Sequence, residues 1–350
     1  MKFIKNFILI LLFIFPISNS FGAMVTHNQT VTVNQSSGGL VAGIEFNNDG
    51  TKMFTSFAQK NGSAYYIEEY NLSKPYDIST RVSAGDSQRC ELTGLETGNS
   101  FSVYDLDFSS DGMRFFVVNR HFNNDTAGAD EVAGFDLTSP YDISTCTFGS
   151  VHDELDTTAL TTGSNAGDFT GANMDHKVQS VEINDDGTKL FLLFYDDEDS
   201  DVGGRLYEYN LSTPYDVSTL SLVLTAGIAV PKTTSGVDNP SGMKFSSDGK
   251  RIFIVGHDSR RISQISLNKA YDTSSFNLDG GVSLVTGISQ TNTQPRGVTF
   301  SANGLKLYIG SDANQNSADQ IMEYDLACPF NIIEGTCPSI TTGDRTGIAI

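Results

Sequence analysis

Short runs of alternating apolar and polar residues, paired around a turn, recur along this chain. The clearest copy covers residues 239–255, NPSGMKFSSDGKRIFIV, with one run on each side of Asp248 and Gly249. Alternation with a period of two on both sides of an Asp-Gly pair predicts a β-hairpin. Because the turn is longer than two residues, we expect Gly249 to adopt a left-handed backbone conformation.

The hairpin occurs five times. The other copies, GIEFNNDGTKMFTSF, DLDFSSDGMRFFVVN, SVEINDDGTKLFLLF and GVTFSANGLKLYIGS, begin at Gly43, Asp105, Ser180 and Gly297. A third strand, a turn such as KPYDIST and a fourth apolar stretch follow the hairpin. The turn glycines, Gly50, Gly112, Gly187, Gly249 and Gly304, are separated by 62, 75, 62 and 55 residues. A repeat of this length with four strands predicts the blades of a β-propeller.

We therefore expect an all-β fold, a five-bladed β-propeller with four antiparallel strands per blade. Seven blades would also fit the 350 residues, but two of them would lack the Asp-Gly hairpin. Residues 30–35, TVTVNQ, alternate without a partner in their own unit. We expect this N-terminal strand to close the last blade beside residues 320–326, which would remove two exposed sheet edges.

The innermost strand of each unit carries a small residue three positions before its last apolar residue. Gly43, Ser180, Gly242 and Gly297 occupy this position, and Asp105 is the exception. Small side chains suit a place where blades crowd around a central axis. We expect Asp105 to project into the channel.

The segments NPSGMKFSSDGKRIFIV and QPRGVTFSANGLKLYIG resemble the repeat of YVTN/lactonase-type and NHL-type β-propellers. The resemblance covers the five hairpins directly and implies the propeller fold for most of the chain. Such repeats encode blades rather than sites. The units here are longer and fewer than in those families, with an added PYDIST turn, so lactonase chemistry does not carry over.

The N-terminus has the features of a signal peptide. Lys2 and Lys5 precede an apolar run over residues 7–17, and small residues near Ala23 offer cleavage sites. A retained membrane anchor is the alternative. We assign residues 1–23 to the signal peptide, 24–340 to the propeller and 341–350 to a tail, which is either a final strand or the start of a further region. No later segment is apolar enough for a transmembrane helix, so we expect a secreted, periplasmic or cell-surface protein.

Charge and cysteines fit that location. The chain has 42 acidic and 22 basic residues, a net charge of −20, which disfavours nucleic acid and anionic lipid as partners. Four cysteines in an exported chain suggest disulfides. Cys328 and Cys337 flank a short loop and are expected to pair, which leaves Cys90 to pair with Cys146.

One acidic loop is the candidate metal site. It carries Asp196, Asp197, Glu198, Asp199 and Asp201. Ca²⁺ prefers several carboxylate oxygens, although the spacing does not match a known calcium loop, and a solvated acidic loop is the alternative. No other cofactor is indicated.

Catalytic signatures are absent from the sequence. There is no G-x-S-x-G or H-E-x-x-H motif, and the five histidines are scattered. We therefore expect a non-catalytic binding module that presents its irregular loops to a protein or glycan partner. The alternative is a propeller hydrolase or lactonase with carboxylates at a channel mouth. Convergence of three carboxylates there would favour the alternative, and an apolar plug would exclude it.

Overall fold

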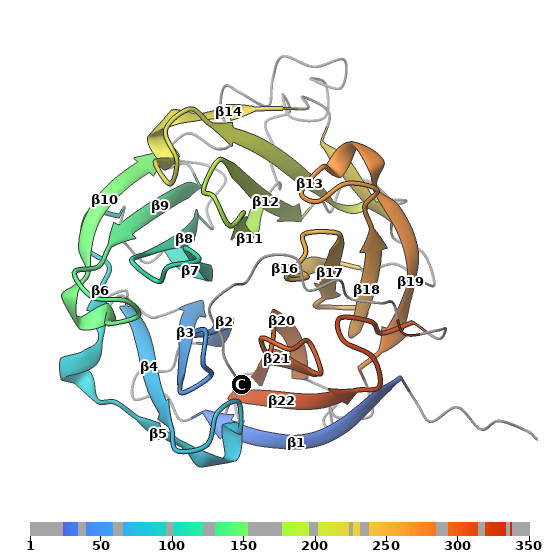
Figure 1. Cartoon of the computed structure of the whole chain (residues 1–350), viewed down its shortest axis with the longest axis horizontal. Helices are drawn as coiled ribbons and strands as arrows, with labels where there is room; N and C mark the ends of the chain where they lie inside the picture. The colour runs from blue at the N-terminus through green and yellow to red at the C-terminus, as the bar shows by residue number, and fades with distance from the viewer. Residues whose placement is uncertain are drawn as a thin grey trace, which may run out of the picture.

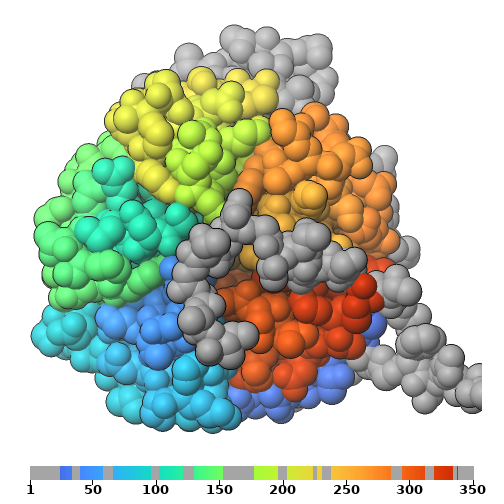
Figure 2. Space-filling model, viewed as in Figure 1, coloured from blue at the N-terminus to red at the C-terminus, as the bar shows by residue number. Residues whose placement is uncertain are grey.

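The computed structural model describes residues 24–33, 40–58, 66–95, 101–121, 130–152, 177–195, 202–223, 227–231, 238–284, 293–313, 319–333 and 337. Five antiparallel sheets surround a central axis (Figure 1). The predicted five-bladed β-propeller with four strands per blade is confirmed, and the seven-bladed alternative is wrong. The space-filling view shows successive blades packed side by side around the ring (Figure 2).

The blades follow the order of the chain. Blade 1 contains β2 (Leu40–Phe46), β3 (Lys52–Ala58), β4 (Tyr66–Leu72) and β5 (Arg81–Ser83), with β6 (Cys90–Glu91) also pairing with β4. Blade 2 contains β7 (Phe101–Phe108), β8 (Arg114–His121), β9 (Glu131–Asp136) and β10 (Thr147–His152). Blade 3 contains β11 (Lys177–Ile183), β12 (Lys189–Tyr195), β13 (Val202–Leu211) and β14 (Leu220–Leu222), with β15 (Ile228–Pro231) beside β13.

Blade 4 contains β16 (Pro240–Phe245), β17 (Arg251–Gly256), β18 (Arg261–Ser266) and β19 (Asn277–Ser283). Blade 5 contains β20 (Thr293–Phe300), β21 (Lys306–Ala313) and β22 (Asp319–Leu326), and its outer strand is β1 (Val25–Val33). In every blade the first strand lies nearest the axis, and the apolar core fills the space between neighbouring sheets.

The N-terminal strand closes the ring as predicted. β1 pairs antiparallel with β22 from Val25 opposite Leu326 to Val33 opposite Asp319. The strand begins before residue 30, where the alternation first becomes regular in the sequence, and Asn34 and Gln35 lie outside the described residues.

All five inner strands have a register shift against the second strand of their blade, immediately before or at the small-residue position of the repeat. A bulge of this kind bends a strand and redirects its side chains. The small residues predicted for the inner strands lie here. A Cβ on Gly242 would lie 2.0 Å from the carbonyl oxygen of Arg296, and one on Gly297 would lie 2.3 Å from that of Ala42. Backbones of adjacent blades therefore meet directly at the axis.

Each hairpin turn is covered by an aromatic ring from the turn that follows the third strand of its own blade, Pro-Tyr-Asp in blades 1 to 3, Ala-Tyr-Asp in blade 4 and Pro-Phe-Asn in blade 5. In blade 4, Gly249 has φ 67° and its carbonyl oxygen accepts a hydrogen bond of 2.9 Å from the Tyr271 amide. Tyr271 is itself left-handed, with φ 55°. Its ring packs on Phe245 of the same blade and on Phe191 of blade 3. Contact between blades thus offsets the strain of a non-glycine residue in this conformation.

The arrangement is repeated in every blade, which explains why both turns recur in the sequence. The other covering residues are Tyr76, Tyr141, Tyr215 and Phe330, all with positive φ.

We predict that Gly249→Ala destabilises the protein, because the new Cβ would lie 2.4 Å from the Tyr271 ring. The free energy of unfolding should fall by about 2 kcal/mol or more, the sum of left-handed strain and a clash. Urea unfolding of Gly249→Ala, Tyr271→Ala and the double variant measures the coupling. Additive losses would contradict the ring contact as the cause.

Both predicted disulfides are present. Cys90 in β6 bonds to Cys146, which follows the 3₁₀ turn η3 (Ile143–Thr145), so the bond links blade 1 to blade 2. Cys328 bonds to Cys337. Within the described part of the chain, no helix has the length and apolarity needed to cross a membrane.

Candidate functional site

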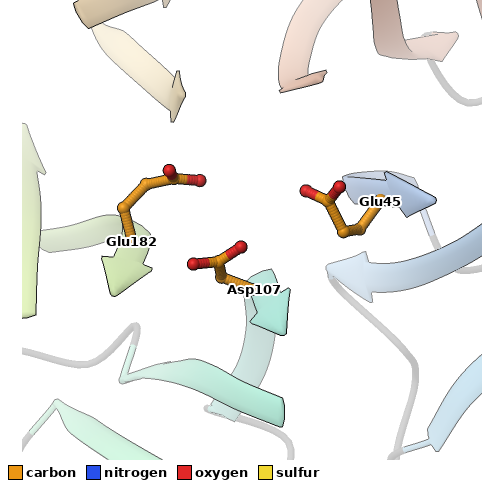
Figure 3. A group of neighbouring side chains, drawn as sticks. All are labelled: Glu45, Asp107 and Glu182. Carbon is orange, nitrogen blue, oxygen red and sulfur yellow. The ribbon is translucent and has the colours of Figure 1, made fainter. Parts of the chain in front are cut away.

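One position in each inner strand forms a ring of polar side chains just before the hairpin turn. The position lies two residues after the small-residue position, and alternation places both toward the channel. Its occupants, from blade 1 to blade 5, are Glu45, Asp107, Glu182, Lys244 and Thr299. Figure 3 shows the three acidic side chains pointing toward one another from three different strands.

The ammonium group of Lys244 lies among these three carboxylates. Its Nζ is 2.6 Å from Glu45 Oε2, 2.8 Å from Asp107 Oδ1 and 2.8 Å from Glu182 Oε1. An ammonium group has three hydrogen-bond donors, so all three are used. A side chain of blade 4 therefore reaches blades 1, 2 and 3 at once.

The carboxylates also bind the neighbouring blades through their second oxygens. Asp107 Oδ2 accepts the backbone N–H of Ile183 in blade 3 at 2.8 Å. Glu182 Oε2 accepts that of Phe245 in blade 4 at 3.2 Å. Glu45 Oε1 accepts the hydroxyl of Thr299 in blade 5 at 3.1 Å. The ring of side chains therefore joins all five blades around the axis.

Burial governs the protonation of the cluster. It raises the pKa of Glu182 well above its ordinary value, and the nearby Asp107 carboxylate adds to the effect. Burial also raises the pKa of Glu45, although Lys244 opposes it. For Lys244, burial would lower the pKa, but the three carboxylates outweigh it and raise the pKa well above the ordinary value. The ammonium therefore stays charged and does not serve as a nucleophile at neutral pH.

The three carboxylates could be taken for a metal site, since one oxygen from each lies within 4.8 Å of the others. However, the Lys244 ammonium is within 2.8 Å of every one of them. A metal ion would have to displace it, so this set of residues does not fit a metal while Lys244 keeps its position. The predicted Ca²⁺ ligands Asp196, Asp197, Glu198, Asp199 and Asp201 all lie outside the described residues.

A cavity of about 120 Å³ opens above the cluster. Its floor is formed by Glu45, Asp107, Glu182 and Lys244. Its walls are the hairpin turns, with Asn48, Ser110, Asp185, Ser247 and Ala302, and the rings of Tyr76, Tyr141, Tyr271 and Phe330 lie among the lining residues. This volume holds several water molecules or part of a small polar ligand.

The cavity lies on the face of the regular hairpin turns, whereas the sequence favoured the irregular loops of the other face. Much of those loops, including residues 122–129 and 196–201, lies outside the described residues, so a binding face there stays a prediction. Three carboxylates do converge at one channel mouth and no apolar plug covers their floor among the described lining residues. This is the condition under which the sequence analysis favours the alternative, a propeller hydrolase or lactonase, over the binding module.

Asp105 lies one layer below the cluster, in β7, and is buried. Its Oδ2 accepts hydrogen bonds from the Ser180 hydroxyl and, at 3.2 Å, from the Val181 amide. The Ser180 hydroxyl in turn accepts the Met243 amide at 3.0 Å. Blades 2, 3 and 4 are thus joined through the Asp105 carboxyl group and the Ser180 hydroxyl. Burial raises the pKa of Asp105 to about 7, against the opposing effect of the Ser180 hydrogen bond.

The sequence analysis did not identify the residues of the cavity floor as site residues, although they occur in the quoted repeats. Reading two positions beyond the small residue in each copy gives the acids of GIEF, DLDF and SVEI and the lysine of GMKF. The sequence does show three acids and one lysine at a single position of the repeat. That these side chains contact one another could not be inferred from the sequence, because only the closed ring of blades brings residues 45 and 182 together.

No model of a known protein family matches this chain. No curated protein matches it either. Solved structures of similar fold include the periplasmic gluconolactonase of Pseudomonas aeruginosa, with 16% identity and a TM-score of 0.47 over 81% of this chain and 67% of that one. The PQQ-bound aldose sugar dehydrogenase of Streptomyces coelicolor has 13% identity and a TM-score of 0.46 over 86% and 97% of the two chains.

The β-propeller fold that the resemblance of the repeat implied is confirmed by the five antiparallel sheets. Likeness at this level carries no inference about activity, because one propeller scaffold hosts many unrelated functions.

We predict that Lys244→Met strongly destabilises the protein near pH 7, because it leaves three buried carboxylates without a cation. The loss should be about 3–5 kcal/mol and should shrink as the pH falls toward 4, where the carboxylates take up protons. Urea unfolding across this range measures it. Lys52→Met is the control, since Lys52 pairs with the single carboxylate of Glu69 at 3.0 Å. Equal losses in the two variants at every pH would contradict the role of the cluster.

We predict that Asp105→Asn removes part of the pH dependence of stability. With the folded pKa raised to about 7, the contribution of this group is fully present below its unfolded pKa near 4 and is lost as the pH rises through 7. The wild type should therefore lose up to about 1.4 kcal/mol per pH unit through this group, and the variant should be the more stable above pH 7. Asp136→Asn, at a half-exposed ion pair with Arg114, should leave the slope unchanged. An unchanged slope in Asp105→Asn would contradict the assignment.

Proposed function

We propose that this protein is a non-catalytic binding propeller that holds a small hydroxyl-rich ligand, such as the end of a glycan, at the channel mouth on the hairpin-turn face. The observation that carries the proposal is the polar cavity of about 120 Å³ with the Lys244 cluster as its floor.

The floor offers hydrogen-bond acceptors. All three donors of Lys244 are engaged, whereas each carboxylate oxygen of Asp107 and Glu182 has one bond from the protein. A carboxylate has about four acceptor sites in total, so half of them remain. A ligand that donates hydrogen bonds matches this floor, and hydroxyl groups are such donors.

Charge narrows the ligand class further. The floor has three carboxyl groups for one ammonium, and Asp185 adds a further acidic side chain to the lining. Lys244 is the sole basic side chain among the described lining residues. An anionic ligand would meet repulsion in a confined site of low dielectric, so a neutral polyol or sugar is favoured.

The fixed position of Lys244 in the cavity floor supports ligand binding rather than catalysis. Lys244 is held by three bonds, and no histidine lies among the described residues of the cavity. A fixed set of acceptors on a closed ring is suited to recognition at low entropic cost. Export fits this role, since two disulfides persist in an oxidising compartment, and a glycan is a partner available outside the cell.

A second candidate is a hydrolase at the same site. Burial and the nearby Asp107 raise the pKa of Glu182, and a carboxyl group that keeps its proton near another carboxylate suits a general acid. The two candidates differ in turnover: the binding protein leaves glycosides and lactones unchanged.

We predict that the wild-type protein binds hydroxyl-rich glycans on a glycan array and that Ser247→Trp weakens this binding. Ser247 is partly exposed in the cavity wall, so an indole there would obstruct the mouth without touching the buried cluster. Titration calorimetry with the bound sugar should show at least a tenfold loss of affinity.

Ser221→Trp is the matched control, because Ser221 is exposed in β14, away from the cavity. It should retain full affinity. Absence of binding to any hydroxyl-rich probe, or equal affinity in both variants, would overturn the proposal. If the wild-type protein hydrolyses the bound glycoside and Glu182→Gln does not, the hydrolase is the function of this site and the binding proposal is wrong.

A further inference from the structure

The lining of the cavity above the Lys244 cluster carries an excess of negative charge. Its acidic side chains are Glu45, Asp107, Glu182 and Asp185, whereas Lys244 is the one basic side chain among the described lining residues. Even with Glu182 protonated, three carboxylates accompany one ammonium group. In a confined site of low dielectric, the charge that disfavours an anionic ligand attracts a cationic one.

Glu182 shows that one ammonium group does not balance the cluster. Burial has the largest effect on the pKa of Glu182 and raises it. Among the charges around this carboxyl group, the repulsion from Asp107 is larger than the attraction of Lys244, and Glu45 adds to the repulsion. A second positive charge above the floor would therefore stabilise the ionised form of Glu182.

The floor also shows how these acids bind an ammonium group. Lys244 Nζ lies 2.6–2.8 Å from one oxygen of each carboxylate, and the three acidic side chains converge from three strands (Figure 3). The oxygens of Asp107 and Glu182 keep acceptor positions beyond their bonds from the protein. An ammonium donor uses these positions better than a hydroxyl, because charge-assisted hydrogen bonds are about twice as strong as neutral ones.

The wall of the cavity adds a carboxylate at a fixed place. Asp185 lies in the hairpin turn between β11 and β12 and is exposed. Its backbone carbonyl accepts the Ser110 hydroxyl of blade 2 at 2.8 Å and also the Tyr215 hydroxyl, and these bonds hold the turn in position. A ligand ammonium would bring the lining to two cations for four acidic side chains, so Lys244 does not exclude it.

We propose that this cavity selects hydroxyl-rich ligands that carry a protonated primary amine, such as amino sugars, over neutral sugars of the same shape. This inference rests on the proposed function, because it names the ligand class of the same cavity. The hydroxyl groups of the ligand donate to the floor, and its ammonium group lies within reach of the floor carboxylates and Asp185. A neutral sugar is accepted, but without the attraction between charges.

Titration calorimetry with two matched trisaccharides tests the selection. The glucosamine trisaccharide of chitosan and the N-acetylglucosamine trisaccharide of chitin differ only in the acetyl groups that remove the charge. At about pH 6 the free amines are protonated. We expect the wild-type protein to bind the glucosamine trisaccharide at least about tenfold more tightly. Added sodium chloride should weaken this binding and leave that of the acetylated sugar unchanged, because salt screens charges.

Asp185→Asn tests the contribution of the wall. The substitution removes one charge and keeps the backbone carbonyl that holds the turn. The ratio of the two affinities should fall about twofold to fivefold, the range of an exposed ion pair. Asp86→Asn is the matched control, because Asp86 is an exposed carboxylate outside the cavity lining. It should keep the wild-type ratio.

The outcomes separate this inference from the proposed function. Equal affinities of the wild-type protein for the two trisaccharides, or a preference for the acetylated one, would overturn the inference and leave the hydroxyl-binding function in place. Binding of neither trisaccharide, nor of any other hydroxyl-rich probe, would overturn both. A preference for the glucosamine trisaccharide that salt does not weaken would contradict attraction between charges as its cause.

Discussion

The contact between the Lys244 ammonium and three carboxylates is the constraint on which the channel of this propeller depends. A cation from blade 4 is held within 2.8 Å of acids from blades 1, 2 and 3. Buried charges of this kind are costly unless every partner is present. Here the backbone amides of Ile183 and Phe245 complete the arrangement. The same set of bonds links blades 1 to 4 across the axis and forms the floor of the cavity.

The blades are joined by a different kind of contact at their hairpin turns. Each of the five hairpin turns is covered by a left-handed aromatic residue, and the ring often reaches the preceding blade, as Tyr271 reaches Phe191. Aromatic contacts therefore join the blades at the turns, while charge joins them at the axis. The strand β1 and the Cys90–Cys146 bond add closure at the rim. These contacts together close the ring around a channel that has the polar cavity at its hairpin-turn end.

Local patterns were sufficient to predict most of the fold. Alternation around Asp248 and Gly249, repeated five times, predicts hairpins, and counting hairpins predicts the blades. The unpartnered strand predicted at residues 30–35 predicts the closure, which β1 makes with β22. The site could not be predicted in the same way, because Glu45, Glu182 and Lys244 are far apart in the sequence and meet only across the channel. The predicted metal loop at residues 196–201 lies outside the described residues.

A crystal structure of the protein grown in calcium chloride, with anomalous scattering data, tests the central claim most directly. The account predicts density for the Lys244 side chain ending among Glu45, Asp107 and Glu182, with Nζ at hydrogen-bond distance from each and no anomalous peak between them. A metal ion bound by these carboxylates, with Lys244 turned away from the axis, would contradict it.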